Sequence, residues 1–394
     1  MLSLPGMAFR LRLTTLLALL VLAAATALVP AFGLGPEGGD LDVFSGYAAK
    51  IVHGAVPYRD LHLEYPPGAL AAIVPPALGA PREHTYAVRF EWGMLALLAL
   101  TISLLARRPR AAFVVALAPL LLGPLVLKRF DALPALLTVV ALLLALRRRH
   151  AWAGAALGLG TAVKLYPVLL LPLVVIGAGR KAGARAVAAF ALACGAVFVP
   201  FLVLAPHGVI SSIRDQVGRH LQIETPLASL AQLAHSFGVL NVGVVSEAHT
   251  YGLGGTSGLL LAVLTTIAFL VSLGLIWFNA PRLVRSHQGL VLAWAATLCA
   301  AVVFGRVLSP QYLVWLLPVV PLVSWRATWL LVASLVLTNI WYPVHYLAVV
   351  VHADRGGIEL LVARNIVLTI LLATLLAAVG RPQRRRSRRA PGGP

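Results

Sequence analysis

The stretch "DLDVFSGYAAKIVHGAVPYRDLHLEYPPGAL", residues 40–70, lies between long apolar runs and carries four of the chain's 13 acidic residues. It begins with an amphipathic segment and ends in a double proline, Pro66 and Pro67, which excludes a continuous helix and favours an extended turn. We therefore interpret the stretch as an ordered segment and not as a flexible linker. We expect it to hold Asp40 and Glu64 at defined positions beside a membrane surface.

The composition of the rest of the chain indicates an all-α polytopic membrane protein. Of 394 residues, 60% are hydrophobic and 11% are charged, against about 25% charged in soluble domains. Mean hydropathy is +0.91. Cys194 and Cys299 lie alone in apolar runs, so neither a disulfide nor a metal site is indicated. The net charge of +19 does not predict a nucleic-acid partner here, because membrane topology accounts for it.

Apolar runs bounded by charged or turn residues predict about twelve transmembrane helices. Since such runs recur along the chain, we expect the first to be a span and not a cleaved signal. Several runs are shorter than the ~20 residues that cross a bilayer and are expected to be tilted or partial crossings. The runs are 13–33, 86–106, 111–127, 132–146, 151–164, 166–178, 186–206, 257–279, 289–304, 311–324, 327–349 and 358–379.

The charges predict the orientation of these spans, since Lys and Arg favour the cytoplasmic side. With both termini cytoplasmic, the inner connections and Arg10 and Arg12 hold 20 of the 32 basic residues and none of the acids. Chemistry is therefore expected on the outer, periplasmic or extracellular face of the cell membrane. The inner connections are 107–110, 147–150, 179–185, 279–289, 324–328 and 381–394.

The same topology predicts one transmembrane domain, residues 1–380, followed by a basic cytoplasmic tail, 381–394, which we interpret as an anchor at the anionic inner leaflet. Two large segments face outward, at 34–85 and 207–256. The second contains several histidines and charged residues, but no pattern in it assigns a role.

Cationic residues recur where the predicted spans return to the outer face. "LKRFDALP" carries Lys128, Arg129 and Asp131, and Lys164, Arg306 and His345 occupy similar places. Each cation alone could simply extend toward the interface. Together they predict a site for an anion, such as a lipid phosphate, beside a carboxylate base.

The motifs of this chain resemble those of glycosyltransferase family 87, the polyprenol-phosphate-mannose-dependent mannosyltransferases. The first outer loop carries Asp40, Phe44, Tyr47, Gly54, Pro57, Tyr58, Asp60 and "EYPPGAL" at 64–70, and "KRFDALP", "AVKLYPVLLLP" and "GRVLSPQYLVWLLP" resemble later signatures. The resemblance implies a GT-C fold, a lipid-linked sugar donor, no nucleotide sugar, inversion at the anomeric carbon and a catalytic Asp in the first loop. Asp40 matches that position; Asp42 is the competitor. Phe44 stands where Tyr is more usual.

On these grounds we expect Asp40 to be the general base, and Glu64, Tyr58 and Asp42 to position the acceptor or the loop. The predicted ligands of the donor phosphate are Lys164, Arg306, Arg129 and His345. No cofactor and no metal are expected: "DLD" at 40–42 has the DxD spacing of divalent-cation sites, but the soluble nucleotide-sugar domain that this motif requires is missing. The expected partners are a polyprenyl-phosphate sugar, a glycolipid or lipoglycan acceptor and membrane lipid.

Other functions remain open at this point. A transporter or flippase of a lipid-linked solute would also use charges within the membrane, but its half-to-half repeats are not evident in this sequence. A non-catalytic scaffold would leave the outer cations without a purpose. The transferred sugar is expected to be mannose, with arabinofuranose as the alternative, and no residue pattern selects between them.

Overall fold

The computed structural model describes residues 4–29, 39–79, 82–247 and 250–381. Most of the predicted tail, and parts of the predicted first outer loop, lie outside these residues. The α-helices are α1 Leu4–Ala27, α2 Asp40–Val52, α3 Leu70–Ile73, α4 Glu83–Leu104, α5 Pro109–Ala116, α6 Ala118–Leu122, α7 Leu125–Lys128, α8 Ala132–Leu146, α9 His150–Val163, α10 Leu171–Ala178, α11 Arg180–Leu204, α12 Pro206–Val217, α13 Pro226–Ser236, α14 Gly255–Leu283, α15 His287–Val303, α16 Trp325–Trp341, α17 Tyr346–His352 and α18 Arg355–Gly380. The strands are β1 Leu221–Gln222, β2 Gly243–Glu247 and β3 Thr250–Gly254, and the short 3₁₀ helices are η1 Pro67–Ala69, η2 Pro75–Ala77, η3 Tyr166–Leu170, η4 Pro310–Trp315 and η5 Val320–Leu322.

Five of the described helices are long and apolar enough to cross a membrane, and they indicate a multi-pass membrane protein. They are Phe9–Ala27, Glu83–Leu104, Arg180–Leu204, Gly255–Leu283 and Arg355–Gly380.

The expected count of about twelve spans is not confirmed, because several apolar runs are broken. Gly123, at φ 71°, and Pro124 help to divide the run 111–127 into α5, α6 and α7. The run 166–178 divides into η3 and α10. A helix as short as α8, with 15 residues, reaches about 22 Å, less than the ~30 Å of hydrocarbon.

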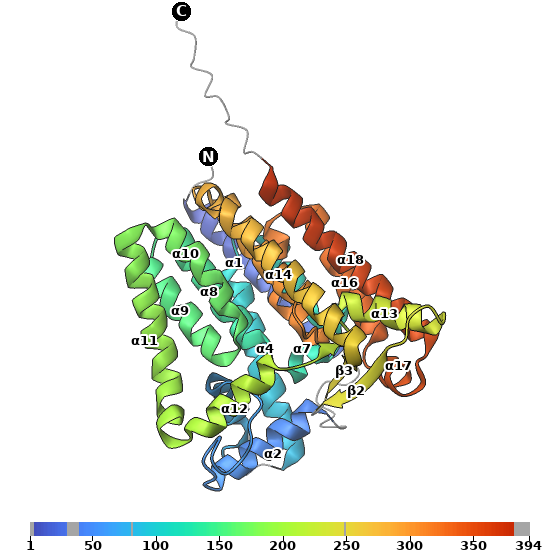
Figure 1. Ribbon diagram of the computed structural model, residues 1–394. Coiled ribbons are helices and arrows are strands. Elements are labelled where there is room, and N and C mark those ends of the chain that lie inside the picture. The colour runs from blue at the N-terminus through green and yellow to red at the C-terminus, as the bar shows by residue number, and fades with distance from the viewer. Residues whose placement is uncertain (1–3, 30–38, 80–81, 248–249, 382–394) are drawn as a thin grey trace, which may run out of the picture.

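The basic turns gather at one end of the bundle. Helix α1 begins and α18 ends there, while α2, α12 and the sheet lie at the opposite end (Figure 1). Two hydrogen bonds join neighbouring turns: the Arg148 guanidinium donates to the Gly177 carbonyl at 3.3 Å, and that of Arg282 donates to the Val379 carbonyl. The predicted separation of basic connections from the outer segments is therefore visible in the fold.

Helix α9 lies very close to α11 because small residues face the contact. A Cβ added at Gly154 or Gly158 would collide with the backbone of Ala186 or Phe190 in α11. Small residues at a spacing of four allow membrane helices to approach in this way. The contact fixes α9, and Lys164 follows its last residue.

At the opposite end, the first outer segment packs against both α9 and α12. A Cβ at Gly68 would lie 2.6 Å from the carbonyl carbon of Ala162 in α9, and one at Gly208 in α12 would collide with Tyr58. The glycine of "EYPPGAL" is thus required by close packing beside Lys164.

The second outer segment forms a small antiparallel sheet with strand order β1-β3-β2. Leu221 of β1 pairs with Leu253 of β3, and both are buried with Ile223 in a separate cluster. This cluster fixes the backbone on either side of Gln222, which pairs with Gly252.

Candidate active site

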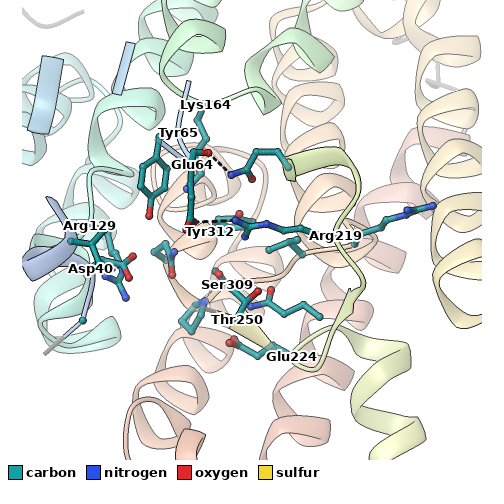
Figure 2. Close-up of a pocket in the computed structure, with 18 of the residues that line it drawn as sticks. Asp40, Glu64, Tyr65, Arg129, Lys164, Arg219, Glu224, Thr250, Ser309 and Tyr312 are labelled. Carbon is teal, nitrogen blue, oxygen red and sulfur yellow. Dashed lines mark hydrogen bonds and ion pairs between the residues drawn. The ribbon is translucent and has the colours of Figure 1, made fainter. Parts of the chain in front are cut away.

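A cavity of about 740 Å³ lies among the first outer segment, the turns after α7 and α9, the sheet and residues 306–315. Figure 2 draws part of its wall, with Asp40, Arg129, Lys164 and Glu224 among the labelled side chains. Six of the eight predicted site residues line it: Asp40, Asp42, Glu64, Arg129, Lys164 and Arg306.

Asp40, the first residue of α2, forms an ion pair with Arg129. The Oδ2 of Asp40 lies 2.6 Å from the Nη1 of Arg129, and the Asp40 side chain keeps 26% of its surface exposed. Arg129 also donates through Nη2 to the Tyr342 hydroxyl at 3.5 Å. Phe44, one turn along α2, is buried and anchors the helix. It packs on the rings of Tyr65, Phe90 and Phe130, each with ring centroids 5.6 Å apart, at interplanar angles of 74°, 33° and 51° respectively.

Glu64 joins the two outer segments. Its Oε2 accepts a hydrogen bond from the Nη2 of Arg219 at 3.3 Å, and its carbonyl accepts one from the Gln216 side chain at 2.5 Å. Gln216 belongs to α12, and Arg219 follows it. Residues about 150 positions apart therefore share one wall of the cavity.

Lys164 is held by a carboxylate and by aromatic rings. Its Nζ lies 2.7 Å from the Oδ1 of Asp131, which also accepts a hydrogen bond from the indole N–H of Trp315 at 2.7 Å. The same Nζ lies 4.4 Å from the ring centroid of Tyr312 and about 5 Å from those of Phe130 and Trp315. Such faces attract a cation. These contacts hold the Lys164 side chain in place on the cavity wall.

Arg306 differs from the other cations because, among the described residues, it has no carboxylate within ion-pair distance. Its Nε donates to the Thr266 hydroxyl of α14 at 3.2 Å, and its carbonyl accepts from the Gln222 N–H at 2.9 Å. A guanidinium held on a cavity wall without a partner anion suits the binding of phosphate.

These features support a site for group transfer at the end of the bundle away from the basic turns. A family model for glycosyltransferase family 87 matches residues 63–310, which is more than half of the chain. The chain belongs to glycosyltransferase family 87. No curated protein sequence matches it significantly. The matched range of this family 87 enzyme starts after Asp40, so the role of Asp40 stays a prediction, based on the loop motif.

Two predicted site residues do not line the cavity of the family 87 enzyme. Tyr58 is buried behind the wall, at φ 68°, and its hydroxyl donates to the Tyr65 carbonyl at 2.6 Å. This contact fits the predicted positioning of the loop. His345 lies just before α17, with Nδ1 3.9 Å from the Asp354 carboxylate. Its role toward a donor phosphate stays a prediction.

Sequence reasoning missed several residues of this wall. They include Arg219, which contacts Glu64, and Tyr312 and Trp315, which surround Lys164. Two more, Gln222 and Glu224, line the cavity from the sheet side. Glu224 is 2% exposed. Burial raises the pKa of its carboxyl to about 8, and the positive charges of Arg364 and Arg129 offset only part of this effect. The one signal in the sequence was an acid beside apolar residues in the mixed segment "LQIETPL".

The prediction of a site without metal stays a prediction. Within the described ranges, no three His, Cys, Asp or Glu side chains lie close enough together to hold an ion. Figure 2 shows instead a site that mixes paired charges, tyrosines and hydroxyl groups. This arrangement can bind an anion and accept a proton within the same cavity.

Proposed function

We propose that the enzyme transfers mannose from a polyprenyl phosphate to a hydroxyl group of a cell-envelope glycolipid or lipoglycan. The observation that carries this proposal is the Asp40 carboxylate, partly exposed in a cavity that also contains Arg129, Lys164 and Arg306. The proposal requires one base and several cations in one cavity, and that is what these residues supply.

In the proposed reaction, the acceptor hydroxyl attacks the anomeric carbon of the donor sugar. Its oxygen forms the new glycosidic bond, the bond from the anomeric carbon to the phosphate oxygen breaks, and the hydroxyl proton passes to Asp40. Arg129 engages Oδ2 of Asp40, which leaves Oδ1 to accept the proton. A single displacement inverts the anomeric configuration. No cofactor is needed for this chemistry.

The phosphate of the donor leaves as an anion, so fixed cations lower the barrier by stabilising charge as it develops. Arg306 is the first candidate for binding this phosphate because its guanidinium forms no ion pair with another described residue. Lys164 adds a second positive charge. Arg306 contacts Thr266 in α14, a helix whose apolar side chains are widely exposed. These include Leu259, Leu260, Val263, Leu264, Ile267, Leu270 and Val271. A prenyl chain attached to a phosphate at Arg306 could pack against these apolar side chains of α14.

The orientation follows from the separation of charge. The basic turns lie at the end of the bundle opposite α2 and α12 (Figure 1), and basic turns favour the cytoplasm. We therefore propose that both termini face the cytoplasm and that the cavity opens to the outer face. Membership of a transferase family favours group transfer over transport. Arabinofuranose remains the alternative donor sugar.

The test is a transfer assay with the purified protein in lipid nanodiscs. The donors are polyprenyl phosphates that carry mannose, arabinofuranose or glucose, and the acceptors are envelope glycolipids. The proposal predicts transfer from the mannose donor, with inversion of the anomeric centre in the product, and no transfer from a nucleotide sugar. Transfer only from a nucleotide sugar, or retention of configuration, would contradict it.

A further inference from the structure

Two buried polar side chains on the sheet side of the cavity have no part in the reaction just proposed. Gln222 and Glu224 are 4% and 2% exposed, and both line the cavity. The Oε1 of Gln222 and the Oε2 of Glu224 have no hydrogen-bond partner among the described residues. Buried polar atoms nearly always have a partner in folded proteins, so these two atoms point to a ligand.

The backbone around these side chains is firmly held. The Gln222 N–H donates to the Arg306 carbonyl at 2.9 Å. The Glu224 carbonyl accepts from the Arg364 guanidinium at 2.8 Å and from the Asn365 amide at 3.1 Å. Partner groups therefore satisfy the main chain and leave the side-chain oxygens for another molecule. A rigid backbone that carries unsatisfied side chains is typical of a preformed binding site.

The surrounding wall has the chemistry of a sugar site. Tyr251 and Tyr346 meet edge to face with centroids 6.3 Å apart, and both line the cavity. Thr250 and Ser309 add hydroxyl groups. Figure 2 places Glu224 at the end of the cavity away from Lys164, with Thr250 and Ser309 between them. A pyranose presents hydroxyl groups at its edge and C–H groups on its face, which suit amide and carboxyl groups and aromatic rings respectively.

The charge of this wall also favours a neutral ligand. Burial raises the pKa of the Glu224 carboxyl to about 8, so at neutral pH the group is mainly protonated and can both donate and accept hydrogen bonds. A phosphate would gain more from the charged side chains of Arg306 and Lys164. The cavity therefore offers cations to an anion and the side chains of Gln222 and Glu224 to an uncharged polar group.

We propose that Gln222 and Glu224, with Tyr251 and Tyr346 beside them, form a saccharide subsite that hydrogen-bonds to the ring hydroxyls of a neutral sugar. This inference deepens the proposed function and rests on it. The ring belongs either to the donor or to the acceptor, and the experiment below separates these two sources.

The experiment compares four full-length variants: Glu224→Ala and Gln222→Ala, which remove the contacts, Glu224→Gln, which keeps the size and the hydrogen bonds, and Asp215→Asn as the matched control. Asp215 lies in the same outer segment, exposed beside His62 and away from the cavity wall. KM for the donor, KM for the acceptor and kcat are measured for each variant, and size-exclusion profile and Tm report folding.

If the subsite exists, both alanine variants should raise the KM for one substrate, either the donor or the acceptor, by ~10-fold. This change corresponds to the loss of about one good hydrogen bond, and kcat should change less. Asp215→Asn should stay near the wild type, and Glu224→Gln should recover most of the affinity that Glu224→Ala loses. A rise in donor KM assigns the subsite to the donor sugar, and a rise in acceptor KM assigns it to the acceptor. Wild-type KM values for both substrates in both alanine variants would overturn the proposal. If Glu224→Ala does not fold, Gln222→Ala carries the same test.

A second readout separates this inference from the proposed function. Saturation-transfer NMR with methyl α-mannopyranoside and methyl α-arabinofuranoside measures sugar binding without turnover. If the wild type transfers no sugar but binds a methyl glycoside, and both alanine variants lose that binding, the proposed donor is wrong and the subsite stands. If the wild type transfers sugar and the alanine variants bind methyl glycosides as well as it does, with unchanged KM values, the subsite is wrong and the transferase proposal stands.

Discussion

Two ion pairs in the cavity wall have nearly the same length but different surroundings. Asp131 and Lys164 lie 2.7 Å apart, and Asp40 and Arg129 lie 2.6 Å apart. The Asp131 side chain is 2% exposed and also binds Trp315, whereas that of Asp40 is 26% exposed. Asp131 therefore has little capacity left for a substrate, and Asp40 has an accessible oxygen. The comparison separates a carboxylate that holds the wall together from one that can act on a ligand.

The largest effect expected from this comparison is on stability. Asp131→Asn leaves the Lys164 ammonium buried without its counter-ion, and removing one member of a buried pair costs about 3–5 kcal/mol. We expect a clear fall in Tm in detergent. The double variant Asp131→Asn with Lys164→Met should recover part of this loss, since it also removes the unpaired charge. Equal Tm for Asp131→Asn and wild type would mean that the two pairs do not differ in the proposed way.

The second effect concerns catalysis more than stability. Arg129→Gln removes the partner of Asp40, but the Asp40 carboxylate is 26% exposed and can still be hydrated, so the fall in Tm should be smaller than that of Asp131→Asn. Turnover should fall at least ~10-fold, because a misplaced base loses its alignment with the acceptor. Steady-state kinetics and Tm measured on the same sample check both parts. A fall in Tm as large as that of Asp131→Asn would contradict the distinction.

A third effect extends the comparison to Glu224, a buried carboxyl that forms no ion pair with another described residue. With its pKa raised to about 8 by burial, the group is neutral below that pH and charged above it. If the neutral acid binds sugar, the affected KM should rise toward ~10-fold by pH 9, while Glu224→Gln should lack this dependence. The charged groups near it are Arg364 and Arg129, which keep their charge over this range. The same pH dependence in both proteins would assign the titration to another group.

The smallest effect is expected at the third pair of the wall, Glu64 and Arg219, whose atoms lie 3.3 Å apart. This geometry is weaker, and the Gln216 contact to the Glu64 carbonyl also holds the loop. Arg219→Gln should change turnover only a few-fold and lower Tm by less than Asp131→Asn does. Thermal unfolding and the transfer assay test this expectation. A loss of activity comparable to that of Arg129→Gln would give Arg219 a role in the reaction.

The sequence predicted the membrane class and the separation of basic turns from the outer segments, and six of the residues that it singled out lie in one cavity wall, while their roles stay predictions. Charge and apolar runs are local signals, and they report membrane topology directly. The number of spans was less predictable, because Gly123, Pro124 and the turn at Lys164 break apolar runs that composition alone joins together.

The pairing of the charges was not predictable. Asp131 and Lys164 were both recognised as polar positions, but their contact depends on how α8 and α9 pack. Glu224 was missed for a related reason: its burial results from contacts with Arg364 and Asn365 in α18, about 140 positions away. A single acid in an amphipathic segment has no spacing that distinguishes a buried carboxyl from a hydrated one.

The most direct test of the central claim compares Asp40→Asn with Asp42→Asn in nanodiscs, measuring binding of polyprenyl-phosphate mannose and single-turnover transfer. Both changes keep the size of the side chain and remove one negative charge, and both residues line the cavity. If Asp40 is the base, Asp40→Asn should bind donor and fold normally but transfer sugar at least ~10²-fold more slowly, while Asp42→Asn retains most of the activity. Wild-type turnover by Asp40→Asn, or the large loss in Asp42→Asn instead, would contradict the assignment of the base to Asp40.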